Sequence, residues 1–211
     1  MTRYLLVIMF SIALNSVHAQ YPGYSPVRDL VAFNNQFAAA AQSTHSIKSD
    51  FIQEKNLSML SEKIISKGKF YFEKDSKVRM DYVHPFTYTM IINNNKVFIR
   101  DGKKENTINA KSNKLFQQII RITLDCVQGT AIKNTDFRTR VFESRNNYLV
   151  ELTPVTKGLK DFFQSIKIVV ERKDNSVSQI DMVEASGDNT LIRFTNRELN
   201  APIPASIFVI K

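Results

Sequence analysis

Residues 67–101 read KGKFYFEKDSKVRMDYVHPFTYTMIINNNKVFIRD. Apolar and polar side chains alternate in four runs, which are separated by polar turns around residues 74–77 and 93–95 and by Pro85. Alternating runs joined by polar turns predict an antiparallel meander of strands. The runs are 68–73, 78–83, 88–93 and 96–100.

The predicted meander has two unlike faces, because successive side chains of a strand point to opposite sides of the sheet. The apolar face collects Phe70, Phe72, Val78, Met80, Tyr82, Met90 and Ile92. The other face is mainly polar and collects Lys69, Glu73, Arg79, Asp81 and Thr89. One face is therefore expected to meet solvent and the other to be covered.

The first 19 residues have the pattern of a secretory signal peptide. Arg3 precedes an apolar run at residues 4–14, and Val17 and Ala19 are spaced like a small-residue cleavage site. The apolar run is shorter than the roughly 20 residues of a membrane-spanning helix. We therefore expect residues 20–211 to form a soluble, exported protein without a lipid anchor, since the residue directly after the cleavage site is Gln20 and not a cysteine.

Charge and cysteine content narrow the possible partners. The formal charge is +9, which suits nucleic acid, anionic lipid or an acidic protein. Export makes nucleic acid the least favoured of these, and the basic residues form no run interleaved with aromatics. Cys126 is the only cysteine, so no intramolecular disulfide can form.

Two helices are expected beside the strands. In residues 26–42, Leu30, Phe33 and Phe37 recur on one face, and in residues 112–126, capped by Ser112, the apolar residues are unusually dense. Further alternating runs predict strands at 46–60, 137–143, 148–152, 165–171, 177–184, 190–195 and 205–210, whereas residues 101–113 look polar and turn-rich.

So many alternating strands would expose a whole apolar face unless the sheet curled. The sequence therefore predicts one mainly β domain over residues 20–211, built as a single strongly curved antiparallel sheet, an incomplete β-barrel, with helices as a lid on its hydrophobic concave face. Its interior is expected to belong partly to the protein and partly to a guest.

Catalytic and metal-binding patterns are missing from the sequence. All six glycines are isolated, so no phosphate loop or nucleophile elbow is present. After Ala19, only His45 and His84 remain as histidines, and neither has a second ligand at metal-binding spacing. A Cys126 nucleophile with His84 as its base is one interpretation, and a core cysteine is the other. We expect no enzyme activity, no metal and no cofactor.

Four segments resemble the periplasmic outer-membrane lipoprotein carrier family, LolA. Residues 51–55 match its F-x-Q-x-K strand and residues 68–72 its G-x-[LF]-x-[FV] strand. Residues 78–82 with Pro85 are similar to its L-R-W-x-Y…P segment, and residues 152–154 with 163–170 to its L-T-P…[FI]-x-x-I-x-[VL] run. The order and spacing of these motifs cover nearly the whole chain after residue 19.

This resemblance implies a monomeric carrier that holds lipoprotein acyl chains in its cavity. It implies loading by an inner-membrane lipoprotein-releasing ABC transporter and delivery to an outer-membrane receptor or membrane. It also implies a lipid-binding cavity, a lid and, at Lys74, a possible lid latch. The cavity residues would be the seven of the apolar face, and the lid residues would be Phe33, Phe37, Leu115, Phe116, Ile119 and Ile120.

The chain departs from the family at two of these places. Lys74 stands where some members have arginine, and lysine lacks the bidentate fork, so a latch would be weaker or absent. Met80 replaces the usual tryptophan, which favours either a more adaptable pocket or an ordinary core methionine. Two other functions stay open: carriage of another lipid or amphiphile, and a regulatory domain that senses lipid or lipoprotein.

Overall fold

A computed structural model describes residues 21–60, 62–74, 77–93, 96–102, 104–109, 118, 121–122, 124–125 and 128–209. Its helices include α1 (Leu30–Ser43) and the one-turn α3 (Lys157–Lys160), and residues 118, 121–122 and 124–125 are also helical. The 3-10 turns include η2 (Ala131–Lys133) and η3 (Ala205–Phe208). Its strands are β1 (Ser25–Pro26), β2 (Ser46–Leu57), β3 (Glu62–Glu73), β4 (Lys77–His84), β5 (Tyr88–Asn93), β6 (Lys96–Asp101), β7 (Lys104–Asn109), β8 (Phe137–Glu143), β9 (Asn147–Pro154), β10 (Phe163–Glu171), β11 (Val177–Glu184) and β12 (Asn189–Leu199).

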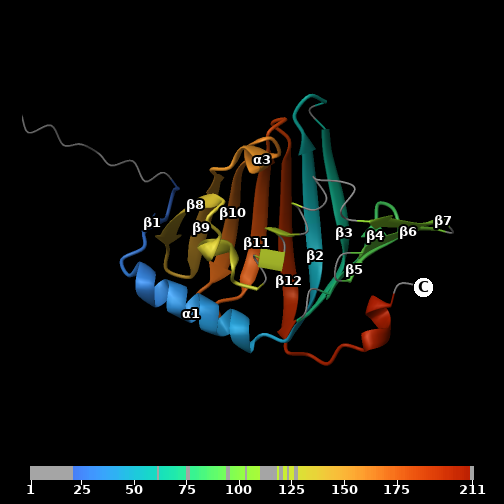
Figure 1. Ribbon diagram of the computed structural model, residues 1–211, viewed down its shortest axis with the longest axis horizontal. Coiled ribbons are helices and arrows are strands. Elements are labelled where there is room, and N and C mark those ends of the chain that lie inside the picture. The colour runs from blue at the N-terminus through green and yellow to red at the C-terminus, as the bar shows by residue number, and fades with distance from the viewer. Residues whose placement is uncertain are drawn as a thin grey trace, which may run out of the picture.

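All twelve strands join one antiparallel sheet in the order β1-β8-β9-β10-β11-β12-β2-β3-β4-β5-β6-β7. The sheet is open, because β1 and β7 end it without pairing with each other. Figure 1 shows its curvature: β8 to β12, β2 and β3 form a broad surface, and β6 and β7 are turned away from it. The prediction of a mainly β, incompletely closed sheet is confirmed.

One position in β3 allows the sheet to bend sharply between β3 and β4. The register shifts between Lys67 and Gly68. A Cβ atom built on Gly68 would lie 1.9 Å from the carbonyl oxygen of Asp81 and 2.8 Å from the ring of Phe51. Only a residue without a side chain allows β4 to approach this closely.

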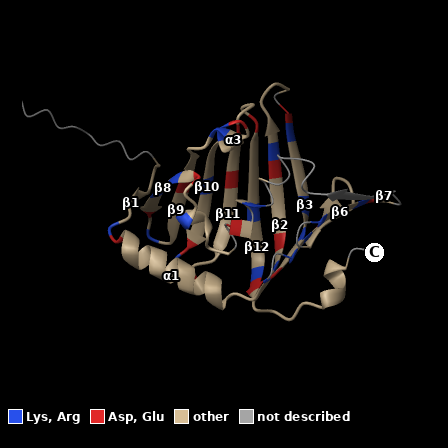
Figure 2. Ribbon diagram, viewed as in Figure 1, with Lys and Arg blue, Asp and Glu red and all other residues tan. Residues whose placement is uncertain are grey.

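Helix α1 covers part of the inner face of the sheet. It runs along the lower ends of β8 to β12 (Figure 1), and Figure 2 shows that it carries no charged residue. Asp29 caps its start by accepting a hydrogen bond from the amide of Ala32 at 2.8 Å. Phe33 and Phe37 are its buried side chains. Pro26, where the helix was expected to begin, lies instead in β1, because the capping side chain comes three residues later.

Two further predictions about strands were wrong. Residues 104–109 form β7, which the sequence hides because KENTIN is polar almost throughout and shows no alternation. Residues 205–208 form η3 rather than a strand. Pro202 and Pro204 precede it, and proline cannot donate a ladder hydrogen bond.

The segment after β12 crosses to the outer face of the sheet. The guanidinium of Arg79 donates to the carbonyl of Ile207 at 2.8 Å, and the side-chain amide of Asn93 donates to the carbonyl of Phe208 at 3.2 Å. Phe208 is only 1% exposed. The tail therefore fixes β4 and β5 from outside, while their other face remains directed inward.

Candidate functional site

A cavity of about 410 Å³ lies on the inner face of the sheet. This volume falls within the range of small-molecule pockets, about 300–1,000 Å³. Six of the seven predicted cavity residues line it: Phe70, Val78, Met80, Tyr82, Met90 and Ile92. Phe72 does not, since it is 1% exposed and belongs to the packed core beside the cavity.

The rest of the lining consists of residues that the sequence did not assign to the cavity. They come mainly from the last three strands along the chain, β10 to β12, where inward-facing positions follow the same period of two as in the meander. These residues are Phe163, Met182, Glu184, Thr190, Ile192 and Phe194, joined by Gln53, Lys55, Tyr88 and Ile99 from strands β2, β5 and β6. Alternation in β10 to β12 was visible, but nothing in the sequence showed that these strands would face β4 and β5.

An aromatic pair separates the cavity from the region under α1. The ring centroids of Phe70 and Phe194 lie 4.9 Å apart. On one side both residues line the cavity, and on the other they line a gap of about 30 Å³ together with Phe37 of α1. Among the described residues, the inner face is thus divided into a half filled by α1 and a half that they leave hollow.

The predicted lid residues fall into two groups. Phe33 and Phe37 are buried in the filled half, where the ring of Phe33 lies 4.7 Å from that of Tyr148, and neither lines the cavity. The second group, Leu115, Phe116, Ile119 and Ile120, lies outside the described residues. Within the predicted second helix, the described residues 118, 121–122 and 124–125 are helical.

Lys74, the predicted latch residue, contacts the end of α1. Its ammonium donates to the carbonyl of Gln42 at 3.2 Å, and its amide donates to the carbonyl of His45 at 2.8 Å. A helix end leaves carbonyls without partners inside the helix, and a lysine there satisfies one of them. Lys74 therefore contacts α1, the first of the two predicted helices.

Tyr82 lies within the apolar lining, and its one polar side-chain atom, the hydroxyl oxygen, has a hydrogen-bond partner. Its hydroxyl donates to the side-chain oxygen of Gln53 at 3.0 Å, and its ring stacks on Tyr88 with the centroids 4.0 Å apart. Burial, with Tyr88 as a second cause, raises the pKa of Tyr82 well above its usual value. Tyr82 therefore stays neutral and contributes to a wall that an apolar guest can contact.

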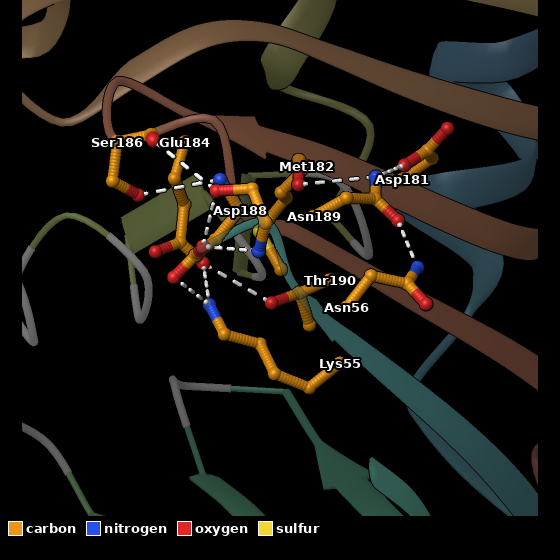
Figure 3. A network of polar contacts seen from close by, with 10 residues as sticks. Lys55, Asn56, Asp181, Met182, Glu184, Ser186, Asp188, Asn189 and Thr190 are labelled. Atoms are coloured by element: carbon orange, nitrogen blue, oxygen red, sulfur yellow. Dashed lines mark hydrogen bonds and ion pairs between the residues drawn. The ribbon is translucent and has the colours of Figure 1, made fainter. Parts of the chain in front are cut away.

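One end of the cavity is polar and charged, at the turn between β11 and β12 (Figure 3). Lys55 forms an ion pair with Glu184 and lies 3.8 Å from Asp188. The Thr190 hydroxyl donates to Glu184 at 3.2 Å. A hydrogen bond from the backbone amide of Ser58, with Lys55 nearby, lowers the pKa of Asp188. We call Lys55, Glu184 and Thr190, which line the cavity, together with the neighbouring Asp188, which does not, the polar end.

The described residues offer no constellation for catalysis by a metal. They contain no group of three or more His, Cys, Asp or Glu side chains that could hold an ion. His45 and His84 are both exposed; His45 directly precedes β2, and His84 is the last residue of β4. Cys126 lies outside the described residues. Among the residues that the structure describes, no helix is long and apolar enough to cross a membrane.

Comparison with known proteins identifies the family. The model of the family described as outer membrane lipoprotein carrier protein LolA matches residues 42–211. No curated protein matches the chain.

Solved structures that resemble this chain have distant sequences. The LolA superfamily protein NE2245 from Nitrosomonas europaea is 11% identical, with a TM-score of 0.47, and the match covers 85% of this chain and 96% of that one. An uncharacterized conserved protein from Thermus thermophilus is 7% identical, with a TM-score of 0.50 and coverages of 85% and 93%. The MucA/MucB complex of Pseudomonas aeruginosa contains a chain that is 14% identical, with a TM-score of 0.50; the match covers 85% of this chain and 60% of that one.

Proposed function

The chain belongs to the LolA family of outer membrane lipoprotein carrier proteins, and we propose that it carries lipoproteins through the periplasm from the inner to the outer membrane. In this proposal residues 1–19 are a signal peptide and residues 20–211 form the carrier. An inner-membrane lipoprotein-releasing ABC transporter loads it, and an outer-membrane receptor or membrane unloads it.

The observation that carries the proposal is the hollow half of the inner face. A folded sheet normally fills such a face with its own side chains, because interiors are packed closely. Here Met80, Phe70 and Phe194 border a cavity of about 410 Å³ that the side chains of the described residues do not fill. An acyl chain has the shape and the apolar surface to fill it, and the family's carriage of lipoproteins supplies one.

The strength of binding must allow release. Burying one methylene contributes about 0.8 kcal/mol, so a fully enclosed sixteen-carbon chain would gain roughly 12 kcal/mol before costs. Several enclosed chains would bind too tightly for a reversible carrier. We therefore propose partial burial, with the guest and the predicted lid helix of residues 112–126 competing for the same apolar surface. Unloading then needs only an acceptor with a better apolar site.

Native mass spectrometry tests the proposal on protein purified from its own periplasm without detergent. Lipid extraction and peptide identification would follow. Co-purified acylated lipoprotein is the expected result. A different amphiphile would make the protein a carrier in another pathway, and an empty cavity would favour a sensing role. MucB, a fold relative whose structure was solved in complex with MucA, makes a regulatory role worth separating from carriage.

A matched pair of variants distinguishes binding in the cavity from binding elsewhere. Met80→Glu places a carboxylate in the cavity wall, and Gln164→Glu adds the same charge at an exposed position next to Phe163. We expect Met80→Glu to lose the co-purified guest and Gln164→Glu to retain it. Equal retention by both variants would contradict the placement of the guest in this cavity.

A further inference from the structure

The inner face of the sheet changes from apolar to polar along one row of residues that crosses β2, β11 and β12. Lys55 follows Gln53 by two residues on β2, Glu184 follows Met182 by two on β11, and Thr190 precedes Ile192 by two on β12. Strands place residues two apart on the same face. Thr190 is also paired with Lys55 in the ladder, so the polar positions of neighbouring strands form one row across the cavity's end.

The charges of this row do not balance. Lys55 is paired with Glu184 and lies within 4.0 Å of Asp188, so one ammonium faces two carboxylates. Their side chains are 24%, 21% and 22% exposed, which makes the site only partly screened by water. The polar end is therefore negative, although the chain as a whole carries a formal charge of +9.

Acceptor atoms remain available at this end. Glu184 receives both Lys55 and Thr190 on its Oε1 atom, and within the described part of the chain no hydrogen bond reaches its Oε2 atom. Asp188 Oδ1 accepts from the amide and hydroxyl of Ser58 at 3.0 and 3.1 Å. Its Oδ2 atom lies 3.8 Å from Lys55, beyond hydrogen-bonding distance. Donors of a guest can therefore be satisfied here.

We propose that the polar end fixes the orientation of the guest and selects its head group, an inference that rests on the proposed carrier function. The acyl chain lies along the apolar wall, and a head that donates hydrogen bonds lies against Glu184, with the negative charge of Asp188 adding to the local field. Suitable heads are neutral groups with N–H or O–H donors and ammonium groups. Carboxylate and phosphate heads are rejected, because the charge of Lys55 is already compensated and an anion would approach two like charges.

The test uses three amphiphiles with the same alkyl length but different heads: laurate, its neutral glycerol monoester and dodecylammonium. Each would displace the neutral fluorescent probe N-phenyl-1-naphthylamine from the purified full chain at low salt. We expect laurate to bind about tenfold more weakly than the monoester, and dodecylammonium at least as tightly as the monoester. Equal binding of laurate and the monoester would overturn the head-group selection while leaving the carrier proposal intact.

Substitutions of the acidic residues and of the lysine at the polar end should change the affinity for laurate in opposite directions. The pair Glu184→Gln with Asp188→Asn should raise laurate affinity about tenfold and lower that of dodecylammonium, whereas Lys55→Met should weaken laurate further. The matched control is Glu54→Gln, since Glu54 is the residue before Lys55, is also ion-paired and does not line the cavity.

The outcomes separate the two proposals. Shifts of laurate and dodecylammonium in opposite directions, with the monoester unchanged, support the selection. An equal shift of all three ligands, or a shift as large in Glu54→Gln, overturns it. If neither the probe nor any amphiphile binds the wild-type chain, the carrier proposal fails, and the head-group selection fails with it.

Discussion

Phe70 of β3 and Phe194 of β12 meet with their ring centroids 4.9 Å apart, across the strand β2 that lies between them in the sheet. The pair belongs to both halves of the inner face, because each ring lines the cavity on one side and the gap beneath α1 on the other. The packing that stabilises the fold and the space proposed for the guest therefore share this wall.

Phe194→Ala should connect the two halves. Removing a phenylalanine side chain from a core costs about 3 kcal/mol, and here the space left behind joins an existing cavity. We expect a lower free energy of unfolding in urea and tighter binding of guests bulkier than a single chain. Phe142→Ala is the control, because Phe142 is buried against Tyr21 outside the main core cluster. A similar loss of stability with unchanged binding is expected there.

Met80 and Phe72 should respond differently to the same charge. Both are buried, but only Met80 lines the cavity. In Met80→Glu the carboxylate can be hydrated by water in the cavity, so we expect a folded protein that no longer binds acyl chains. In Phe72→Glu the charge has no such space, and burial of an unpaired charge should unfold the chain. Circular dichroism and probe binding distinguish these outcomes; a folded Phe72→Glu protein would contradict the packing described here.

Gly68→Ala should destabilise the sheet where it bends. The new methyl group would meet the backbone oxygen of Asp81, which cannot move without shifting β4. Overpacking of this kind costs about 1–3 kcal/mol, measurable by urea unfolding. Gly158→Ala is the matched control, since a Cβ atom there meets nothing within 4 Å and the residue lies in α3. It should be neutral or slightly stabilising. Equal effects at both positions would count against the close approach at Gly68.

Tyr21 gives the protein a dependence on alkaline pH. Burial, then its hydrogen bond to Glu151 at 2.7 Å, raises the pKa of Tyr21 from 10.0 to about 12. The folded state thus holds this proton more tightly than the unfolded state, so the contribution is fully present below pH 10.0 and is lost as the pH rises through about 12. Tyr21→Phe should lower stability by about 1 kcal/mol at neutral pH. The difference from wild type should vanish at high pH; a constant difference would assign it to another contact.

Lys74→Leu should change little. It removes one exposed hydrogen bond to Gln42, while the backbone hydrogen bond to His45 remains. We expect a loss of no more than about 0.5 kcal/mol and unchanged guest binding, because exposed contacts of lysine contribute weakly. Lys74→Arg serves as the control that keeps the charge. A large defect in lipoprotein transfer with Lys74→Leu would show that this residue does latch a lid.

The sequence predicted the fold well where one face is buried. Alternation in β4, β5, β8 and β11 marks each strand to within a residue or two, because burial imposes a period of two on the side chains. It failed in β7, which is polar almost throughout, and after β12, where prolines precede a segment that packs on the outer face. Local pattern carries no information about such tertiary contacts.

The sequence predicted one wall of the cavity and not the other. The apolar residues of the meander lie together on consecutive strands, so alternation alone groups them. The other wall depends on the curl of the sheet, which brings Met182 and Ile192 to face β4 and β5. The polar end was equally hidden, since Lys55 and Glu184 are separated by 129 positions and nothing in the sequence pairs the lysine of one motif with a glutamate at the end of a distant strand.

An open sheet has two edges, and here they differ in their capacity to recruit another chain. At one edge β1 is two residues long and ends in Pro26, which has no amide hydrogen to donate. At the other edge β7 is six residues long, and no further strand pairs with it in the described part of the chain. If two copies associate by strand addition, β7 is therefore the favoured edge, and pairing β7 with β7 would close into a dimer, because the same edge is used by both chains.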